Sequence, residues 1–83
     1  MPTINLRLFA LLREQTGVDR ESLQTSAQSV SALRAELVTR GGAWASLQES
    51  ARIKAAINQT LAGEDHPIQD GDEVAFFPPV TGG

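Results

Sequence analysis

DGDEVAFFPPVTGG, residues 70–83, is the stretch that most limits how the rest of the chain can fold. The Asp-Gly pair at its start is typical of a turn, and the apolar run after it predicts a strand from Glu73 to Phe77. Side chains alternate along a strand, so Phe76 and Phe77 are expected on opposite faces of a sheet. A small domain can cover only one of these faces with a helix. One of the two phenylalanines is therefore expected to be exposed.

The chain continues beyond this strand as a short tail. Pro78 and Pro79 cannot donate to a strand ladder, and consecutive prolines favour an extended polyproline II conformation. The next four residues, 80–83, can reach roughly 13 Å at about 3.3 Å per residue. Gly82 and Gly83 have no side chains, so the tip can enter a very narrow channel. The ending is predicted to be a thin probe that carries the terminal carboxylate.

A free carboxylate needs activation before it can react as an acyl group. It is ionised at neutral pH, with a reference pKa of about 3.3–3.7, and is a poor electrophile. The sequence lacks the G-x-x-x-x-G-K-[ST] loop that would bind the phosphates of a nucleotide. Activation is therefore expected from another protein, which makes the chain a carrier or a macromolecular substrate. The alternatives are a frayed glycine tail without a role and a non-covalent adaptor whose tail is inert.

The start of the chain predicts a second strand and a hairpin. Ile4, Leu6 and Leu8 alternate with polar residues, which is the period of a half-buried strand, and Phe9 falls on the polar side. Turn residues around Gly17 and a weaker strand pattern in residues 21–27 then predict a hairpin.

One amphipathic helix is predicted in the middle of the chain. Ser29 is suited to cap it, Arg40 is expected in its last turn, and Gly41-Gly42 should stop it. Its apolar stripe consists of Val30, Leu33 and Leu37. A short helical turn follows in residues 43–50, with Trp44 and Leu47 directed to the core, and a strand is predicted for residues 55–58. The order predicts an α+β fold, a mixed sheet packed on one main helix.

Composition bounds the class of protein. With 83 residues the chain is expected to form one domain, residues 1–77, followed by the tail, residues 78–83. The absence of cysteine excludes disulfides, thiolate metal sites and a cysteine nucleophile. Neither a signal-peptide pattern nor an apolar run of about 20 residues occurs, so the cytoplasm is the expected compartment and no membrane partner is expected.

Charge is distributed unevenly along the chain. The net charge is −3, but residues 1–54 sum to +2, with seven basic and five acidic residues, and residues 55–83 sum to −5, with five acidic residues and no base. An acidic functional end disfavours nucleic acid as a partner and predicts a basic protein surface instead.

The terminal block, together with "INQTLAGEDHPIQ" at residues 57–69 and "LRLFALLREQTG" at residues 6–17, resembles the small subunits of molybdopterin synthase. These proteins are ubiquitin-like sulfur carriers. The resemblance runs in order through nearly the whole length and is specific in the terminal block, whereas residues 19–52 are only compatible with it. It implies a ubiquitin-like β-grasp fold, with the terminal glycine first adenylated and then converted to a thiocarboxylate. The thiocarboxylate would donate sulfur to cyclic pyranopterin monophosphate.

The resemblance also implies partners and site residues. Gly83, preceded by Gly82, would carry the adenylate and the thiocarboxylate. The first partner would be a large synthase subunit, in a heterotetramer of two small and two large subunits. The others would be a ubiquitin-activating-type adenylyltransferase that uses ATP and Mg²⁺, and a sulfur donor. No cofactor is expected on this chain itself. The implied partner-binding residues are Phe9, Arg13, Leu61, Phe77, Pro78, Pro79, Val80 and Thr81.

The same diglycine would also serve a carrier for thiamine or for tRNA thiolation, or a protein modifier joined to lysines. The non-covalent adaptor also stays open.

Other candidate residues are predicted to have ordinary structural roles. His66 beside Pro67 is interpreted as a turn residue, and Asp70-Gly71-Asp72 as turn chemistry, because the other ligands of a calcium loop are missing. Glu64 and Asp65 could act as a catalytic pair only within a pocket, which a domain of this size is not expected to provide. Arg7 and Lys54 are predicted to be solvated strand residues.

Overall fold

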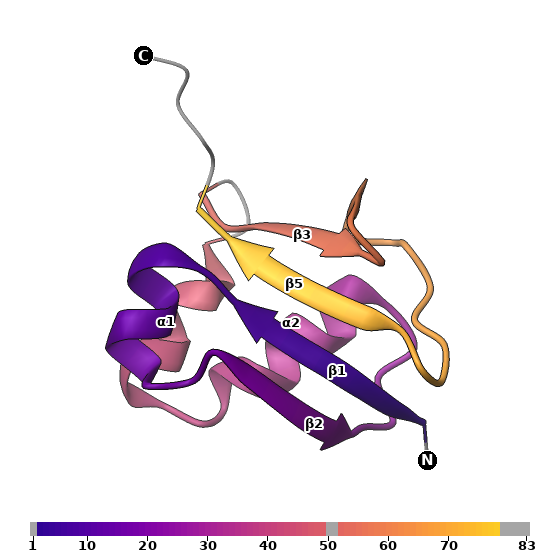
Figure 1. Cartoon of the computed structure of the whole chain (residues 1–83), viewed down its shortest axis with the longest axis horizontal. Coiled ribbons are helices and arrows are strands. Elements are labelled where there is room, and N and C mark those ends of the chain that lie inside the picture. The colour runs from indigo at the N-terminus through magenta and orange to yellow at the C-terminus, as the bar shows by residue number, and fades with distance from the viewer. Residues whose placement is uncertain (1, 50–51, 79–83) are drawn as a thin grey trace.

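The computed structural model describes residues 2–49 and 52–78 as a five-stranded mixed sheet with helices on one side (Figure 1). Its elements in chain order are β1 (Thr3–Leu8), α1 (Ala10–Thr16), β2 (Arg20–Gln24), α2 (Val30–Val38), the 3-10 helix η1 (Gly42–Gln48), β3 (Lys54–Ile57), β4 (Thr60–Ala62) and β5 (Glu73–Phe77). The strand order is β2-β1-β5-β3-β4, with β1 parallel to β5 and the other neighbours antiparallel. The predicted α+β class and the hairpin of β1 with β2 are confirmed.

The two strands with the strongest alternation lie at the centre of the sheet. Ile4, Leu6, Leu8, Val74 and Phe76 are each completely buried on the inner face, against α2. Because β1 and β5 are paired in parallel, Leu6 lies opposite Val74 and Leu8 opposite Phe76. The predicted strand at Glu73–Phe77 is confirmed to the residue. In Figure 1, α2 passes behind these strands, and the outer face of the sheet is turned toward the viewer.

The main helix, α2, forms where its apolar stripe predicts it. The Ser29 side chain caps it by accepting a hydrogen bond of 3.2 Å from the backbone N–H of Ala32. The helix ends at Val38, so Arg40 lies beyond its last turn, contrary to the prediction. Arg40 instead bonds the Glu21 carboxylate of β2 with both of its terminal nitrogens.

A second helix, α1, was not predicted. The residues between the hairpin strands were expected to be a turn, yet seven of them form α1, with Leu12 buried on its inner side. Gly17 ends the helix with a positive φ of 76°, and its N–H bonds the Arg13 carbonyl. The N-terminus has no side-chain cap, because Phe9 occupies the cap position. The absent cap and the short length explain why residues 10–16 carry no clear helix signal.

The segment after α2 folds as a short helix, as predicted. Leu47 of η1 is buried in the core, and Trp44 packs against the core while the Arg40 guanidinium lies 4.4 Å from its ring centre.

A buried arginine joins the helices to the sheet. Arg34 of α2 is 5% exposed and forms two hydrogen bonds with the Glu64 carboxylate, of 2.9 and 2.7 Å. A third bond, of 2.6 Å, reaches the carbonyl of Leu47, and the guanidinium lies 5.2 Å from the centre of the Phe76 ring. A single side chain on α2 therefore holds η1, β5 and the loop that follows β4 in place against this helix. None of the helices in the described ranges is long and apolar enough to cross a bilayer.

Candidate functional site

The outer face of the sheet is the face that no helix covers in the described residues. Strand pairing places one row of side chains straight across it: Arg20 opposite Arg7, Arg7 opposite Ala75, Ala75 opposite Ala56, and Ala56 opposite Leu61. This row runs from basic side chains on β2 and β1 to apolar ones on β5, β3 and β4. The outer face thus has a basic half and an apolar half.

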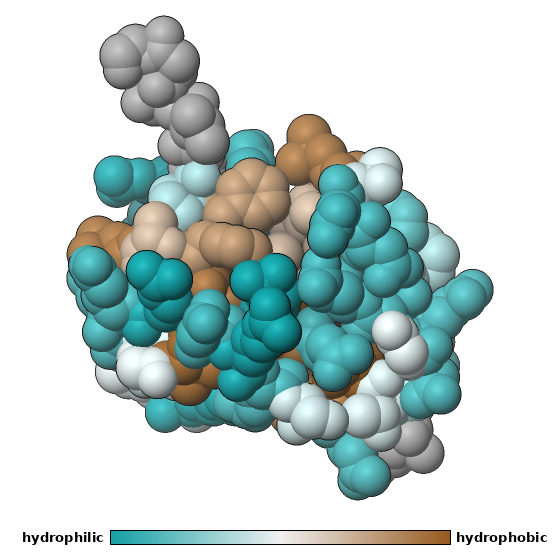
Figure 2. All heavy atoms as spheres, viewed as in Figure 1, coloured by the Kyte–Doolittle hydropathy of each residue, from teal (hydrophilic) through white to brown (hydrophobic). Residues whose placement is uncertain are grey.

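The apolar half contains a hollow of about 480 Å³ next to the point where the described chain ends. Its apolar lining consists of Phe9, Ala10, Ala56, Ala75, Phe77 and Pro78, and we call it the aromatic hollow. In Figure 2, apolar spheres gather over this part of the outer face, between teal polar groups. Phe9 and Phe77 are both half-buried, so each ring keeps an accessible surface. An accessible apolar patch of this kind, with a polar rim, is typical of a protein-docking surface.

The structure brings together three of the residues implied by the resemblance, Phe9, Phe77 and Pro78, in the aromatic hollow. Leu61 lies on the same face, directly opposite Ala56, and is 71% exposed. Arg13 is exposed on α1 and does not line the hollow. The other implied site residues, Pro79, Val80, Thr81, Gly82 and Gly83, lie outside the described residues.

Arg7 differs from its prediction as a solvated residue, whereas Lys54 is exposed as predicted. The Arg7 side chain is only 23% exposed, pairs with Glu73 at 3.9 Å, and has its guanidinium 4.8 Å from the centre of the Phe9 ring. The sequence did not single out this contact, because it depends on strand pairing and on the turn of the chain into α1. Arg7 therefore forms the boundary between the two halves of the outer face.

Two further residues near the aromatic hollow were missed. Ala10 has a positive φ of 53°, which is strained for a residue with a Cβ, and it turns the chain sharply from β1 into α1 directly after Phe9. Leu11 is 57% exposed on α1. Because α1 was not predicted, the sequence offered no reason to place Ala10 in the hollow or Leu11 near Pro78.

The acidic residues near the end of the chain are mostly engaged inside the protein. Asp70 accepts a 2.7 Å bond from the backbone of Thr3, and Asp72 accepts bonds of 3.0 Å from Asn58 and 2.8 Å from the backbone of Gln69. This confirms turn chemistry for the Asp-Gly-Asp stretch. Glu64 and Glu73 pair with arginines, as described above. The bonds of Asp70 and Asp72 come from neutral groups and leave their negative charges in place, so a basic partner surface stays a prediction.

The other candidate residues make structural contacts within the described residues. Glu64 is bonded to Arg34, so it does not form a carboxylate pair with the exposed Asp65. His66 is exposed, and its Nδ1 contacts the carbonyl of Pro67 at 2.8 Å. Across residues 2–49 and 52–78, no three acidic, histidine or cysteine side chains gather as metal ligands would. What the outer face offers is a surface for a protein, close to the base of the tail.

Comparison with known proteins gives the family of the chain. The family model described as the ThiS family matches residues 6–83. This chain belongs to the ThiS family. The molybdopterin synthase sulfur carrier subunit of Escherichia coli (strain K12) is 46% identical over 80 residues, which cover 96% of this chain and 99% of that protein.

Solved structures of similar proteins confirm the ubiquitin-like β-grasp fold. A putative molybdopterin converting factor, subunit 1, from Pyrococcus furiosus superposes with a TM-score of 0.79 at 27% identity and covers 96% of this chain and 100% of its own. The small archaeal modifier protein 1 from Methanosarcina acetivorans superposes with a TM-score of 0.77 at 25% identity and covers 100% of this chain and 98% of its own. The fold is therefore shared by proteins with different names, and it does not by itself distinguish a sulfur carrier from a modifier.

Proposed function

We propose that this chain is the sulfur carrier subunit of a molybdopterin synthase. The observation that carries the proposal is the 46% identity to a sulfur carrier subunit over nearly the full length of both chains. The ThiS family match supports it, because it runs through the diglycine to residue 83.

The proposed chemistry takes place at the carboxylate of Gly83 on two partners. On a ubiquitin-activating-type adenylyltransferase that binds ATP and Mg²⁺, a carboxylate oxygen attacks the α-phosphate, and pyrophosphate leaves. Sulfide released by a donor then attacks the acyl carbon of the adenylate, AMP leaves, and the product is a thiocarboxylate. On the large synthase subunit, this sulfur attacks a carbon of cyclic pyranopterin monophosphate. Water then cleaves the acyl–sulfur bond, so that the sulfur stays on the pterin and Gly83 regains its carboxylate. The chain supplies the acyl group and its delivery, and it binds no cofactor of its own.

The outer face would hold the chain on its partners during both steps. Phe9, Phe77 and Leu61 offer accessible apolar surface there, and Pro78 joins the aromatic hollow to the tail. A partner that covers the hollow would therefore contact Pro78, where the tail begins. The remaining tail, Pro79 to Gly82, would then extend into the partner, with Arg13 at the edge of the interface.

The assembly and compartment follow from the same proposal. The chain would join the large subunit in a heterotetramer of two small and two large subunits. The cytoplasm is the compartment in which ATP-dependent activation would occur.

The intact mass of the chain tests the proposal. The protein would be incubated with its adenylyltransferase, ATP, Mg²⁺ and a sulfur source. We expect a species heavier by one oxygen-to-sulfur exchange, which is absent when Gly83 is deleted. An unchanged mass together with no adenylate would contradict the proposal and would favour the non-covalent adaptor.

A second candidate is a protein modifier, which the similarity to the small archaeal modifier protein favours. The two functions differ in the fate of the activated glycine. A modifier would form amide bonds with lysines of other proteins, whereas a synthase carrier would regain its carboxylate as molybdopterin forms.

A further inference from the structure

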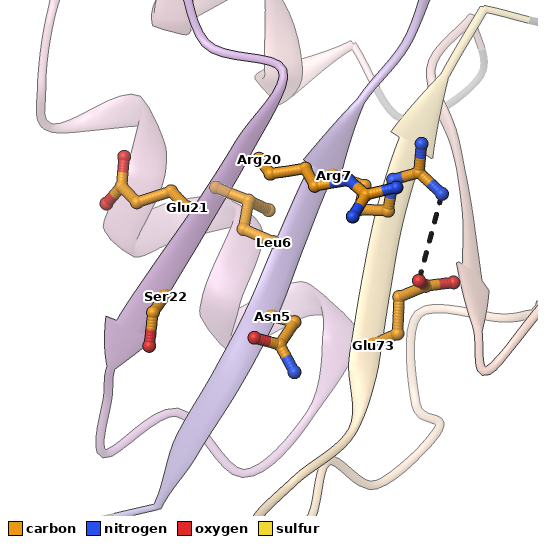
Figure 3. Close-up of a pocket in the computed structure, with 7 residues that line it drawn as sticks. All are labelled: Asn5, Leu6, Arg7, Arg20, Glu21, Ser22 and Glu73. Atoms are coloured by element: carbon orange, nitrogen blue, oxygen red, sulfur yellow. Dashed lines mark ion pairs between the residues drawn. The ribbon is translucent and has the colours of Figure 1, made fainter.

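The basic half of the outer face contains a second hollow, of about 380 Å³, which we call the arginine hollow (Figure 3). Its polar lining comes from three strands: Arg20, Glu21 and Ser22 of β2, Asn5 and Arg7 of β1, and Glu73 of β5. In the close-up, the side chains of Arg7 and Arg20 both extend toward β5, and the dashed line joins Arg7 to Glu73.

Strand pairing brings the two arginines as close as a sheet allows. The N–H of Leu8 donates a 3.1 Å bond to the carbonyl of Asp19, so these two residues form a hydrogen-bonded pair. Pairs alternate along an antiparallel ladder, and Arg7 with Arg20 is therefore a non-hydrogen-bonded pair, in which side chains lie closest together. Like charges directly opposite each other destabilise a sheet. The fold alone gives no reason for two arginines here.

The charges of this pair are only partly compensated inside the protein. Glu73 lies 3.9 Å from Arg7 Nη1, which is too long for a hydrogen bond. The Nε of Arg7 is buried, and it has no hydrogen-bond partner among the described residues. The ion pairs found within residues 2–49 and 52–78 do not include Arg20. Two guanidinium groups thus face one weakly held carboxylate.

We propose that Arg7 and Arg20 bind an aspartate or glutamate side chain of the large synthase subunit. The proposal rests on the proposed function and extends the docking surface from the aromatic hollow into the arginine hollow. The two hollows are continuous, because Arg7 and Glu73 line both and the Arg7 guanidinium lies over Phe9. A guanidinium can hold a carboxylate through two parallel bonds, which an ammonium cannot do. Glu73 compensates the positive charge of the two arginines only in part, and the partner's carboxylate would compensate the rest.

The binding constant for the isolated large subunit tests this proposal. The double variant Arg7→Gln/Arg20→Gln would be compared with the wild type at low and high ionic strength. We expect the double variant to bind about tenfold more weakly at low salt and to depend less on salt, because an ion pair has been removed. The single variant Arg20→Gln should show part of this effect. Arg20 is exposed, so its replacement is not expected to disturb folding.

Arg52→Gln is the matched control. It removes the same charge from a side chain that is 79% exposed, lines neither hollow and pairs with Glu49 of the segment before β3. Its binding should stay within about twofold of the wild type, as for an exposed surface charge.

The variant Phe77→Ala separates a failure of this proposal from a failure of the proposed function. If it weakens binding while the double arginine variant does not, the docking surface is correct and the arginine proposal is overturned. If the wild type does not bind the large subunit, both proposals are overturned. Loss of inorganic phosphate binding in the double variant, with unchanged binding of the large subunit, would assign the arginines to a small anion and also overturn the proposal.

A cross-link can identify the partner's carboxylate. The chain contains a single lysine, Lys54, so the triple variant Arg7→Lys/Arg20→Lys/Lys54→Arg carries side-chain amines only in the arginine hollow. A carbodiimide should join position 7 or 20 to an aspartate or glutamate of the large subunit. A complex that forms with this variant but gives no such amide would contradict the proposal.

Discussion

The two faces of the sheet use alternate residues of the same strands for different purposes. On β5, Val74 and Phe76 are completely buried against α2, whereas Ala75 and Phe77 line the aromatic hollow on the other side. The inner face is closed by helices and by the bonds of Arg34, and the outer face keeps accessible rings and incompletely compensated charge. Substitutions at adjacent residues of one strand should therefore affect different properties. Those on the inner face should lower stability, and those on the outer face should weaken binding of the partner.

The largest expected effect is on the inner face. Phe76→Ala removes a completely buried ring and leaves a cavity, which should lower the free energy of unfolding by about 3–5 kcal/mol. A chain of 83 residues has a total stability of only about 4–12 kcal/mol, so the substitution should remove a large share of it. Urea titration followed by circular dichroism measures this change. A loss below about 1 kcal/mol would mean that the ring is not part of the core.

Loss of the bonds to Arg34 should have the next largest effect on stability. Glu64→Ala leaves a guanidinium that is buried without its carboxylate, a change that typically lowers stability by about 3–5 kcal/mol. The Glu64 side chain is 39% exposed and water can replace part of the contact, so we expect about 2–3 kcal/mol. The same titration measures it, and Asp65→Ala, at an exposed neighbour, is the control.

A third substitution probes the residue next to Phe76. Phe77→Ala should change the free energy of unfolding by less than about 1 kcal/mol, because its ring is only half-buried. It should nevertheless weaken binding of the large subunit at least tenfold, or by about 1.4 kcal/mol. Calorimetric titration measures the binding. Equal effects of Phe76→Ala and Phe77→Ala on stability would remove the distinction between the faces.

The smallest expected effect is a pH dependence of the ion pair between Glu21 and Arg40. Hydrogen bonds from Arg40 lower the pKa of Glu21, and the same bonds raise the pKa of Arg40. A lowered carboxyl pKa contributes stability above the pKa of the unfolded chain, and this contribution is lost as the pH falls through the folded value. The pair is partly exposed, so its contribution should be at most about 1 kcal/mol. Urea titrations between pH 6 and pH 3 of the wild type and of Glu21→Gln should converge as the pH falls.

The central part of the fold could be predicted from the sequence because its signals are local. The alternation of Ile4, Leu6 and Leu8, and that of Val74 and Phe76, gave the two central strands, and the stripe that begins at Val30 gave α2. The helix α1 could not be predicted, since it is short, has no capping side chain and begins at a strained Ala10.

The site was predictable only in part, because its parts depend on pairing between distant segments. The sequence pointed to Phe77 and Pro78 through their place beside the tail and to Phe9 through its place on the polar side of the first strand pattern, and the resemblance implied all three together with Leu61. The pairing of Arg7 with Arg20 results from the hairpin register, and no local pattern specifies it. The role of Arg34 was also hidden, because an arginine on a helix is usually exposed and this one is buried by partners from three other elements.

The most direct test of the account is a single turnover with the chain already carrying a thiocarboxylate at Gly83. The protein would be mixed with the large subunit and cyclic pyranopterin monophosphate, and its intact mass would be followed together with the formation of molybdopterin. We expect that the chain regains its carboxylate as the product forms, and that Phe77→Ala slows both changes equally when the large subunit is subsaturating. Formation of the complex with the thiocarboxylate left intact would contradict this expectation.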